Sequence, residues 1–277
     1  MFSTITDKHL ITGLKTSLCT MLLVAASSAA NAVPELYPHQ AKYEMKLLSA
    51  NQDTQVVAVS GKVKFEIEND CKGWVSSEDY LIEFNYNSGD SSVMFSHFES
   101  WEDYEGKLYS FEIEERSSFD KDKSFMGYAS RQGQGSAVEA YNSLAPDTPM
   151  TLPEDVYFPV RHTQQIIKQA QSGEKLFYAD IFYGAEPERS LKRTSTVIGS
   201  LQDIARPELQ EMLDKKTYYP VQIAYFDPNS SEATPDYEIT FHVQENGVIA
   251  YYEVDYGDFA LKADLVEITA LPEPSCS

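Results

Sequence analysis

Residues 237–265 read YEITFHVQENGVIAYYEVDYGDFALKADL, and apolar and polar side chains alternate through most of this stretch. Alternation with a period of two is typical of a β-strand that buries one face and leaves the other in water. Asn246-Gly247 interrupts the alternation, and this dipeptide between two alternating runs is a strong hairpin signal. Tyr256-Gly257 interrupts it again. The stretch therefore predicts three consecutive antiparallel strands.

The same alternation dominates the first half of the chain. It recurs over residues 41–47, 59–68, 80–86, 93–101 and 108–114. The segment from Gly127 to Gly135 is polar and contains glycine, so we expect a loop or an irregular strand there. No repeat with a period of roughly 20–50 residues is evident, which argues against a propeller or a solenoid.

The middle of the chain changes from the strand period to the helix period. An extended segment ends near Pro159, and Thr163 is then expected to cap a helix that ends at Gly173. A second, shorter helix is predicted to begin at Pro207 and to end before Tyr218, because proline is favoured in the first helical turn.

These patterns together predict an all-β protein with two short helices. A long, curled antiparallel sheet would form an open, spiral-like β-barrel, and one helix would cover an opening. No linker rich in Ser, Gly or Pro divides residues 33–277, so we expect one domain over that range.

The first residues have the features of a secretory signal. Lys8 and Lys15 give a positive start, residues 18–26 form a short apolar run, and Ala30-Asn31-Ala32 matches an A-x-A cleavage site. We therefore expect Met1–Ala32 to be cleaved on export, with an uncleaved N-terminal anchor as the main alternative. No later apolar run approaches the roughly 18 residues of a membrane-spanning helix, so none is expected in the mature chain.

The charge of the chain excludes one class of partner. Asp and Glu number 43 against 22 Lys and Arg, which gives a formal net charge of −21. Nucleic-acid binding depends on clustered basic residues, so this balance argues against it. The same charge would repel anionic lipid headgroups. Hydrophobic residues make up 42% of the chain, which is enough for a packed core and argues against disorder.

The cysteines indicate a disulfide. Cleavage of the signal would remove Cys19, and Cys71 and Cys276 would remain in an oxidising compartment, where a single intramolecular pairing is possible. Two unrelated buried thiols are the alternative. A metal site is disfavoured, because neither cysteine has a second Cys or a His at ligand spacing.

Familiar catalytic patterns are absent from the sequence. It contains no G-x-S-x-G, H-E-x-x-H, P-loop or G-x-G-x-x-G. The S-x-x-K matches at Ser118–Lys121 and Ser172–Lys175 lack the supporting motifs of serine hydrolases. Residues 120–124 resemble the start of a calcium loop, but Phe125 stands where the loop requires Gly. We therefore predict no cofactor and no metal site.

Carboxylate pairs and one histidine remain as weak candidates. Glu66 and Glu68 share a strand face, as do Glu253 and Asp255, and a glycosidase needs two carboxyl groups about 5–10 Å apart. With 43 acidic residues, such pairs are expected by chance, so no catalytic residue is predicted. For His162, which lies beside the expected helix, we favour a structural role. The aromatic strands are expected to fill a core, and a cavity for an acyl chain or a peptide is the minority interpretation.

Short segments along the whole mature chain carry a resemblance. They are Cys71-Lys-Gly-Trp74, Ser100-Trp-Glu-Asp103, Leu152-Pro153 with Phe158-Pro159, Tyr219-Pro-Val221 with Tyr225-Phe-Asp227, Pro235-Asp-Tyr-Glu238, Glu245-Asn-Gly-Val248, Asp255-Tyr-Gly-Asp-Phe259 and the terminal Cys276. In their order and spacing, from about His39 to Cys276, the chain resembles the EipB family of periplasmic cell-envelope integrity proteins. Each segment is weak alone, and the series is fairly specific.

The resemblance implies both a fold and a role. The fold would be a β-spiral, an overwound open barrel with helices, with a disulfide between Cys71 and Cys276. The role would be to maintain the envelope of a Gram-negative bacterium under stress, in the periplasm, through contact with other periplasmic proteins, including those of the tetratricopeptide-repeat type. The family has no established catalytic residues, so none is carried over to this chain.

Two classes of function follow. The first is a non-enzymatic periplasmic protein that maintains envelope integrity by binding other envelope components, with a carrier of a lipid or lipoprotein acyl chain as a variant. The second is a cell-wall glycan hydrolase that uses two carboxylates, one of which would need a raised pKa.

Overall fold

The structure is a computed structural model that describes residues 33–276, apart from residues 119–120, 134–136 and 186–188. Within it, Val33–Ser277 forms one compact unit. The predicted signal Met1–Ala32 lies outside the described residues, so its cleavage stays a prediction. Among the described residues, no helix has both the length and the apolar character needed to cross a membrane.

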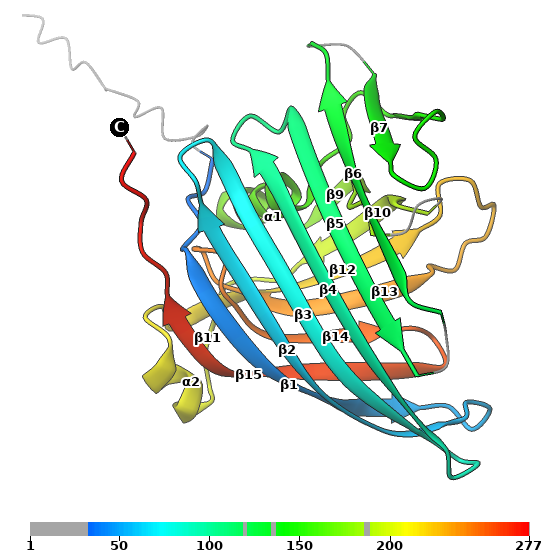
Figure 1. The fold of residues 1–277 in the computed structure, drawn as a ribbon. Coiled ribbons are helices and arrows are strands. Elements are labelled where there is room, and N and C mark those ends of the chain that lie inside the picture. The colour runs from blue at the N-terminus through cyan, green and yellow to red at the C-terminus, as the bar shows by residue number, and fades with distance from the viewer. Residues whose placement is uncertain (1–32, 119–120, 134–136, 186–188, 277) are drawn as a thin grey trace, which may run out of the picture. The chain divides into compact units, whose positions relative to one another are not determined.

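Strands make up most of this unit, and two helices interrupt them (Figure 1). The strands are β1 (His39–Ala50), β2 (Val56–Asn69), β3 (Gly73–Tyr86), β4 (Ser91–Asp103), β5 (Leu108–Ser117), β6 (Lys123–Arg131), β7 (Val138–Asn142), β8 (Met150–Leu152), β9 (Leu176–Phe182), β10 (Leu191–Ile198), β11 (Gln202–Asp203), β12 (Thr217–Phe226), β13 (Tyr237–Val243), β14 (Ile249–Asp255) and β15 (Phe259–Ala270). The helices are α1 (Pro159–Ser172) and α2 (Pro207–Met212).

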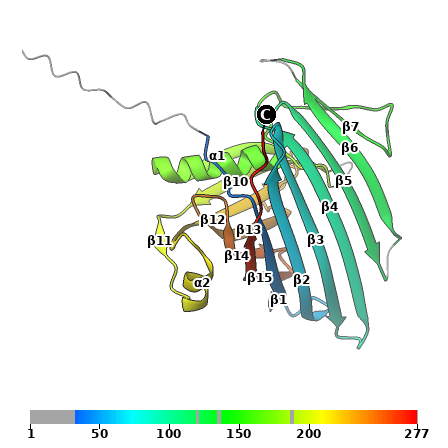
Figure 2. The same cartoon turned by 60° about the vertical axis from the view of Figure 1, so that its left-hand side comes forward.

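The strands form one antiparallel sheet in the order β8-β7-β6-β5-β4-β3-β2-β1-β15-β14-β13-β12-β10-β9, with β11 paired to β12. Pairing of β1 with β15 joins the start of the unit to its end, with Met45 opposite Ala263. The sheet curls so that β2–β6 form the near wall in Figure 1 and β9–β14 run behind them, and Figure 2 separates the two walls. The predicted all-β, open-barrel fold class is confirmed.

A seam remains where the two ends of the strand order meet. Strands β8 and β9 are not neighbours in the sheet. The backbone of Tyr157, just after β8, instead makes a parallel bridge to β9 at Ile181. Its N–H donates to Asp180 O at 2.8 Å, and its carbonyl accepts from Phe182 N at 2.9 Å. Among the described residues, the backbone of Tyr157 links the two edges, and the barrel is nearly closed.

Helix α1 begins five residues earlier than the sequence predicts, with its N-cap at Phe158 instead of Thr163. Phe158 occupies the N-cap position and Pro159 the first turn, whereas the hydroxyl of Thr163 donates to Pro159 O at 3.0 Å. The prediction of Thr163 as the cap was wrong because the acceptor comes from elsewhere in the chain. Glu102 in β4 accepts hydrogen bonds from the first free backbone N–H groups of the helix. The C-terminal end at Gly173, which is left-handed with φ of 84°, agrees with the prediction.

Three apolar clusters fill the barrel. The first lies at the end covered by α1, where Ile166 and Ile167 of the helix pack with Val221 and Val243. Both views place α1 at that end (Figure 1 and Figure 2). The second is capped by Leu209 of α2, and the third lies beneath β5–β8 beside the seam. Helix α1 therefore covers one opening of the barrel, as the sequence suggests.

Strand β6 differs from its prediction, and strand β12 was not predicted. Residues 127–131, expected to be loop or irregular, belong to regular strand β6, where Gly127 is required because a Cβ there would lie 2.3 Å from Tyr141 O. Strand β12 contains Pro220, a residue that usually argues against a strand interior. Its carbonyl accepts from Gly199 N, just beyond the end of β10 at Ile198. The missing N–H of Pro220 therefore faces a side where strand pairing has already stopped.

Candidate functional site

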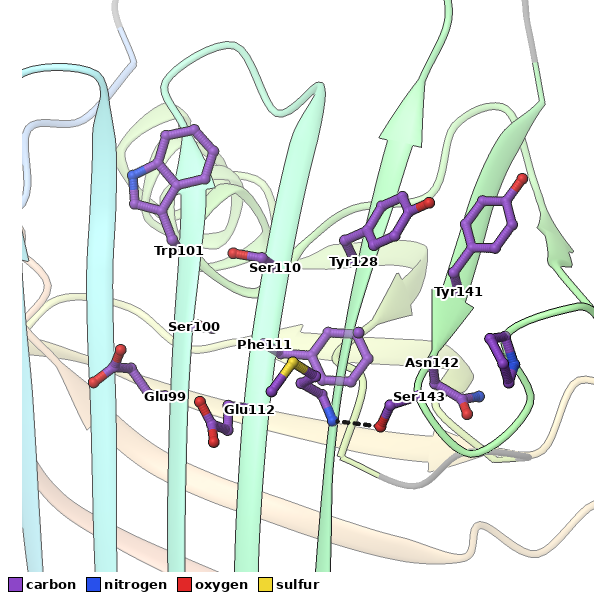
Figure 3. Close-up of a pocket in the computed structure, with 13 residues that line it drawn as sticks. Glu99, Ser100, Trp101, Ser110, Phe111, Glu112, Tyr128, Tyr141, Asn142 and Ser143 are labelled. Atoms are coloured by element: carbon purple, nitrogen blue, oxygen red, sulfur yellow. Dashed lines mark hydrogen bonds between the residues drawn. The ribbon is translucent and has the colours of Figure 1, made fainter.

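A groove of about 530 Å³ lies on the outer face of β4–β7 and is open to solvent (Figure 3). It is lined by Glu99, Ser100, Trp101, Ser110, Phe111, Glu112, Met126, Gly127, Tyr128, Tyr141, Asn142, Ser143 and Pro146. Its volume falls within the range of about 300–1,000 Å³ that is usual for ligand sites. The strands of this face supply two rows of side chains.

The first row is aromatic. Strand register places Trp101 opposite Ser110, Ser110 opposite Tyr128, and Tyr128 opposite Tyr141. Figure 3 shows the three rings at one level across the strands. The Tyr128 and Tyr141 rings stack with centroids 4.9 Å apart. The small Ser110 leaves the space between Trp101 and Tyr128 hollow, so the row forms the long side of the groove.

The second row is acidic at one end and apolar at the other. Glu99 lies directly opposite Glu112, and Glu112 lies opposite Met126. Both carboxylates are exposed, and no described Lys, Arg or His lies within 4.0 Å of either one. Met126 is 55% exposed and Tyr128 is 51% exposed. The groove therefore combines an uncompensated pair of negative charges with exposed apolar surface.

A hydrogen bond ties the aromatic row to the turn between β2 and β3. The indole N–H of Trp101 donates to Asp70 Oδ2 at 3.0 Å, and Asp70 Oδ1 accepts from the backbone N–H groups of Lys72 and Gly73. Burial by itself would raise the pKa of Asp70, but these hydrogen bonds lower it below its usual value. The carboxylate thus stays charged and holds Trp101 to the turn that carries Cys71.

The two cysteines predicted to pair are bonded in the structure. Cys71 and Cys276 have an S–S distance of 2.00 Å and a Cα–Cα distance of 5.5 Å. The segment before Cys276 is also held by hydrogen bonds from Leu271 N to Pro38 O and from Asn69 Nδ2 to Glu273 Oε2. The C-terminal segment is therefore fixed next to the turn that supports Trp101.

The next residue of β4 points into the barrel and holds α1. Glu102 is 1% exposed, and its carboxylate accepts from Val160 N at 2.8 Å and from Arg161 N at 3.0 Å. Burial raises the pKa of Glu102 to about 8, although the two backbone N–H groups oppose that shift. Adjacent residues of β4 therefore serve the groove on one face and the helix on the other.

The carboxylate pairs singled out from the sequence do not assemble into an acid–base site. Glu66 is ion-paired with Lys64 at 3.0 Å and accepts from Gln40. Burial would raise the pKa of Glu66, but these partners lower it, which is the opposite of what a general acid needs. Its neighbour Glu68 is exposed. In the second pair, Glu253 accepts from the Tyr251 hydroxyl and Asp255 is exposed.

The other candidates have structural contacts. His162 is buried in the first turn of α1 beside the rings of Tyr157 and Phe177, and burial lowers its pKa to about 4, so it is neutral. In the second S-x-x-K match, Ser172 donates to Gln169 O and Lys175 donates to Ser200 Oγ. The first match and the calcium-like loop include residues 119–120, which lie outside the described residues. The described part of the chain holds no cluster of three or more His, Cys, Asp or Glu suited to a metal.

The space beside the seam is small. A cavity between Phe111, Ala140, Met150 and Phe182 has a volume of about 10 Å³, which is room for about one water molecule. This volume is too small for an acyl chain.

Sequence reasoning missed the groove. Its outward residue Tyr128 lies in the segment Gly127 to Gly135, which was expected to be a loop or an irregular strand, and Met126 directly precedes that segment. Phe125 and Ala129 face inward. Alternation over residues 125–129 was the available signal, and large apolar side chains on the wet face would have marked the site. The pairing of Glu99 with Glu112 depends on strand register, which the sequence leaves open.

Comparisons with known proteins agree with one another. The sequence model of a family described as EipB-like matches residues 30–272. The chain is 27% identical over 249 residues to the cell envelope integrity protein EipB of Brucella abortus, covering 88% of this chain and 87% of that protein. A crystal structure of a β-barrel-like protein of unknown function from Brucella abortus superimposes with a TM-score of 0.79 at 25% identity, covering 87% of this chain and 100% of the other.

Proposed function

Because the chain belongs to the EipB-like family, we propose that it supports the integrity of the cell envelope from the periplasm. It does so by binding another envelope component at the groove on β4–β7, without catalysing a reaction. The name of the Brucella abortus relative supports the role. The bonded cysteines support the compartment, because disulfides persist in oxidising surroundings such as the periplasm.

The observation that carries binding is the exposed apolar surface of the groove. Met126 and Tyr128 are each more than half exposed, and they lie beside Tyr141 in a hollow rather than singly on a convex surface. Contiguous exposed apolar patches with polar rims usually mark interaction sites. Periplasmic proteins of the tetratricopeptide-repeat type are one class of component that such a face could bind.

The groove supports binding better than hydrolysis. Glycan hydrolysis by two carboxylates needs one group that is desolvated and protonated. Glu99 and Glu112 are both exposed, so neither has that environment.

A pair of matched double variants tests the proposal. Met126→Ser with Tyr128→Ser removes the apolar part of the groove, and Leu176→Ser with Tyr178→Ser makes the same kind of change on β9. Leu176 is 56% exposed and Tyr178 is 67% exposed, so both variants alter a comparable surface. Each replaces the chromosomal gene, and growth is measured on a membrane-disrupting detergent, with protein level followed by immunoblot.

We expect the groove variant to lose detergent resistance at normal protein level and the β9 variant to keep it. Equal resistance of the two variants, at equal abundance, would contradict the assignment of the groove. Lipid mass spectrometry on protein purified from the periplasm addresses the acyl-chain carrier. One acyl species per protein molecule would favour the carrier over the proposal.

A further inference from the structure

We propose that the groove binds an extended, cationic segment of a partner protein. A Lys or Arg of that segment lies between Glu99 and Glu112, and apolar residues next to it cover Met126 and Tyr128. This inference rests on the proposed function, because it names the chemistry of the component that the groove binds.

The opposed carboxylates are the first argument. Glu99 and Glu112 face each other on neighbouring strands, where side chains lie about 5 Å apart. Like charges placed directly opposite in this way destabilise a sheet. In the next row the residue opposite Glu114 is His97, whose ring nitrogen lies 2.6 Å from Asp79 Oδ1, so two carboxylates do not face each other across β4 and β5 there. A cation supplied by a partner would compensate the Glu99–Glu112 pair.

The apolar end of the groove is the second argument. The rings of Tyr128 and Tyr141 lie nearly parallel, with centroids 4.9 Å apart, and Met126 is two residues from Tyr128 on the same strand. Aromatic faces attract cations and pack against apolar side chains. A segment that fits both ends is therefore amphiphilic, with its charge over β4 and β5 and its apolar residues over β6 and β7.

The length of the groove favours a polypeptide. The row from Trp101 to Tyr141 crosses β4, β5, β6 and β7, which is three strand spacings or about 14 Å. An extended chain covers that distance with about four residues, at about 3.3 Å per residue. A small amine would fill the acidic end alone and leave the apolar end uncovered.

The net charge of the whole chain also favours a cationic ligand. At −21, the protein repels anionic lipids and phosphates and attracts basic segments over distances of about 10 Å. Uncompensated carboxylates on an acidic surface therefore favour a basic protein segment over an anionic envelope lipid.

The test measures binding of a labelled peptide to the full mature protein. The probe is Gly-Ser-Lys-Arg-Leu-Pro-Leu-Ser-Gly, and its control carries two Glu in place of Lys-Arg. Glu99→Gln with Glu112→Gln is compared with Glu68→Gln with Glu83→Gln, which changes the net charge equally at exposed positions outside the groove. Fluorescence anisotropy gives Kd at low and at physiological salt.

We expect the basic peptide to bind. The groove variant should weaken its binding by about tenfold, the effect of losing two exposed charge contacts. The control variant should change Kd by less than about twofold, and salt should weaken binding. Equal binding of the acidic peptide, equal effects of the two variants, or no binding at millimolar peptide would each overturn the proposal. One of these contradicting results can occur while the Met126→Ser, Tyr128→Ser variant is sensitive to detergent. In that case the groove still binds an envelope component, and that component is not cationic.

Discussion

Residues 101 and 102 show how one strand serves two purposes. Trp101 faces outward and donates to Asp70, whereas Glu102 faces inward and accepts from the first turn of α1. A helix leaves its first N–H groups without partners inside the helix, and buried groups of this kind must find an acceptor. Because Phe158 has no capping side chain, the position of α1 depends on Glu102.

Removing that acceptor should destabilise the protein. Glu102→Ala leaves the N–H groups of Val160 and Arg161 buried without a partner, and we expect a loss of about 2–3 kcal/mol in the free energy of unfolding. Urea denaturation followed by circular dichroism measures it. Glu83→Ala, an exposed position on β3, serves as the control and should change stability by less than about 0.5 kcal/mol. Equal midpoints for the two variants would show that Glu102 does not hold the helix.

Acidification should destabilise the protein through His162. Its pKa is about 4 in the folded state and about 6.5 when unfolded, so the unfolded chain binds more protons between these values. The stabilisation is present above pH 6.5 and is lost as pH falls toward 4. The shift corresponds to up to about 3 kcal/mol.

Unfolding of His162→Gln provides the comparison. Between pH 7 and pH 4 the wild type should lose about 3 kcal/mol more than this variant, since His39 and His242, whose pKa values burial also lowers, titrate in both proteins. Parallel pH profiles of the two proteins would contradict the assignment.

The turn between β2 and β3 is the element that connects the chain end to the groove. Cys71 adopts a left-handed conformation with φ of 72°, which is uncommon outside glycine. Asp70 stabilises that turn by accepting from Lys72 and Gly73. The disulfide from Cys71 to Cys276 then fixes the segment after β15 next to this turn.

Breaking the Cys71–Cys276 disulfide should lower the stability of the protein and leave the β-sheet folded. The bond spans 205 residues, for which the chain-entropy model gives up to about 5 kcal/mol. We expect Cys276→Ser to lower Tm while the far-ultraviolet circular dichroism of the strands stays the same. Cys71→Ser and the double variant should lose as much as the single variant and no more, because all three break one bond. Two free thiols in wild-type protein labelled after denaturation without reductant would show that the clamp is absent in the periplasm.

The elements differ in how far the sequence predicts them. The hairpin at Asn246-Gly247 and the strands around it follow from local alternation and turn chemistry, and they are present as β13–β15. The start of α1 could not be predicted, because its acceptor Glu102 lies 58 residues away from Val160. The groove could be predicted only in part. Alternation over residues 125–129 indicates that Met126 and Tyr128 face outward, but the pairing of Glu99 with Glu112 depends on strand register. Local sequence patterns therefore predict which strands and helices form. Contacts with residues distant in sequence determine where a helix begins and which side chains of different strands lie together.

At the scale of the whole molecule, two contacts hold the barrel together: the pairing of β1 with β15 and the bridge between Tyr157 and Ile181. The first strand, β1, pairs with the last strand, β15, and Tyr157 joins the two edges of the sheet. This arrangement leaves the outer face of β4–β7 uncovered among the described residues, and that face carries the groove. A rigid wall of antiparallel strands suits a binding surface, because strand register fixes the spacing of the side chains that a partner meets.

Photo-crosslinking in living cells tests most directly whether the outer face of β4–β7 contacts a partner in the envelope. A photoreactive phenylalanine analogue is placed at position 128 in the groove or at position 178 on β9, and adducts are detected by immunoblot after irradiation. We expect a discrete adduct from position 128 and none from position 178. The same adduct from both positions, or none from position 128 in cells that the variant protects from detergent, would contradict it.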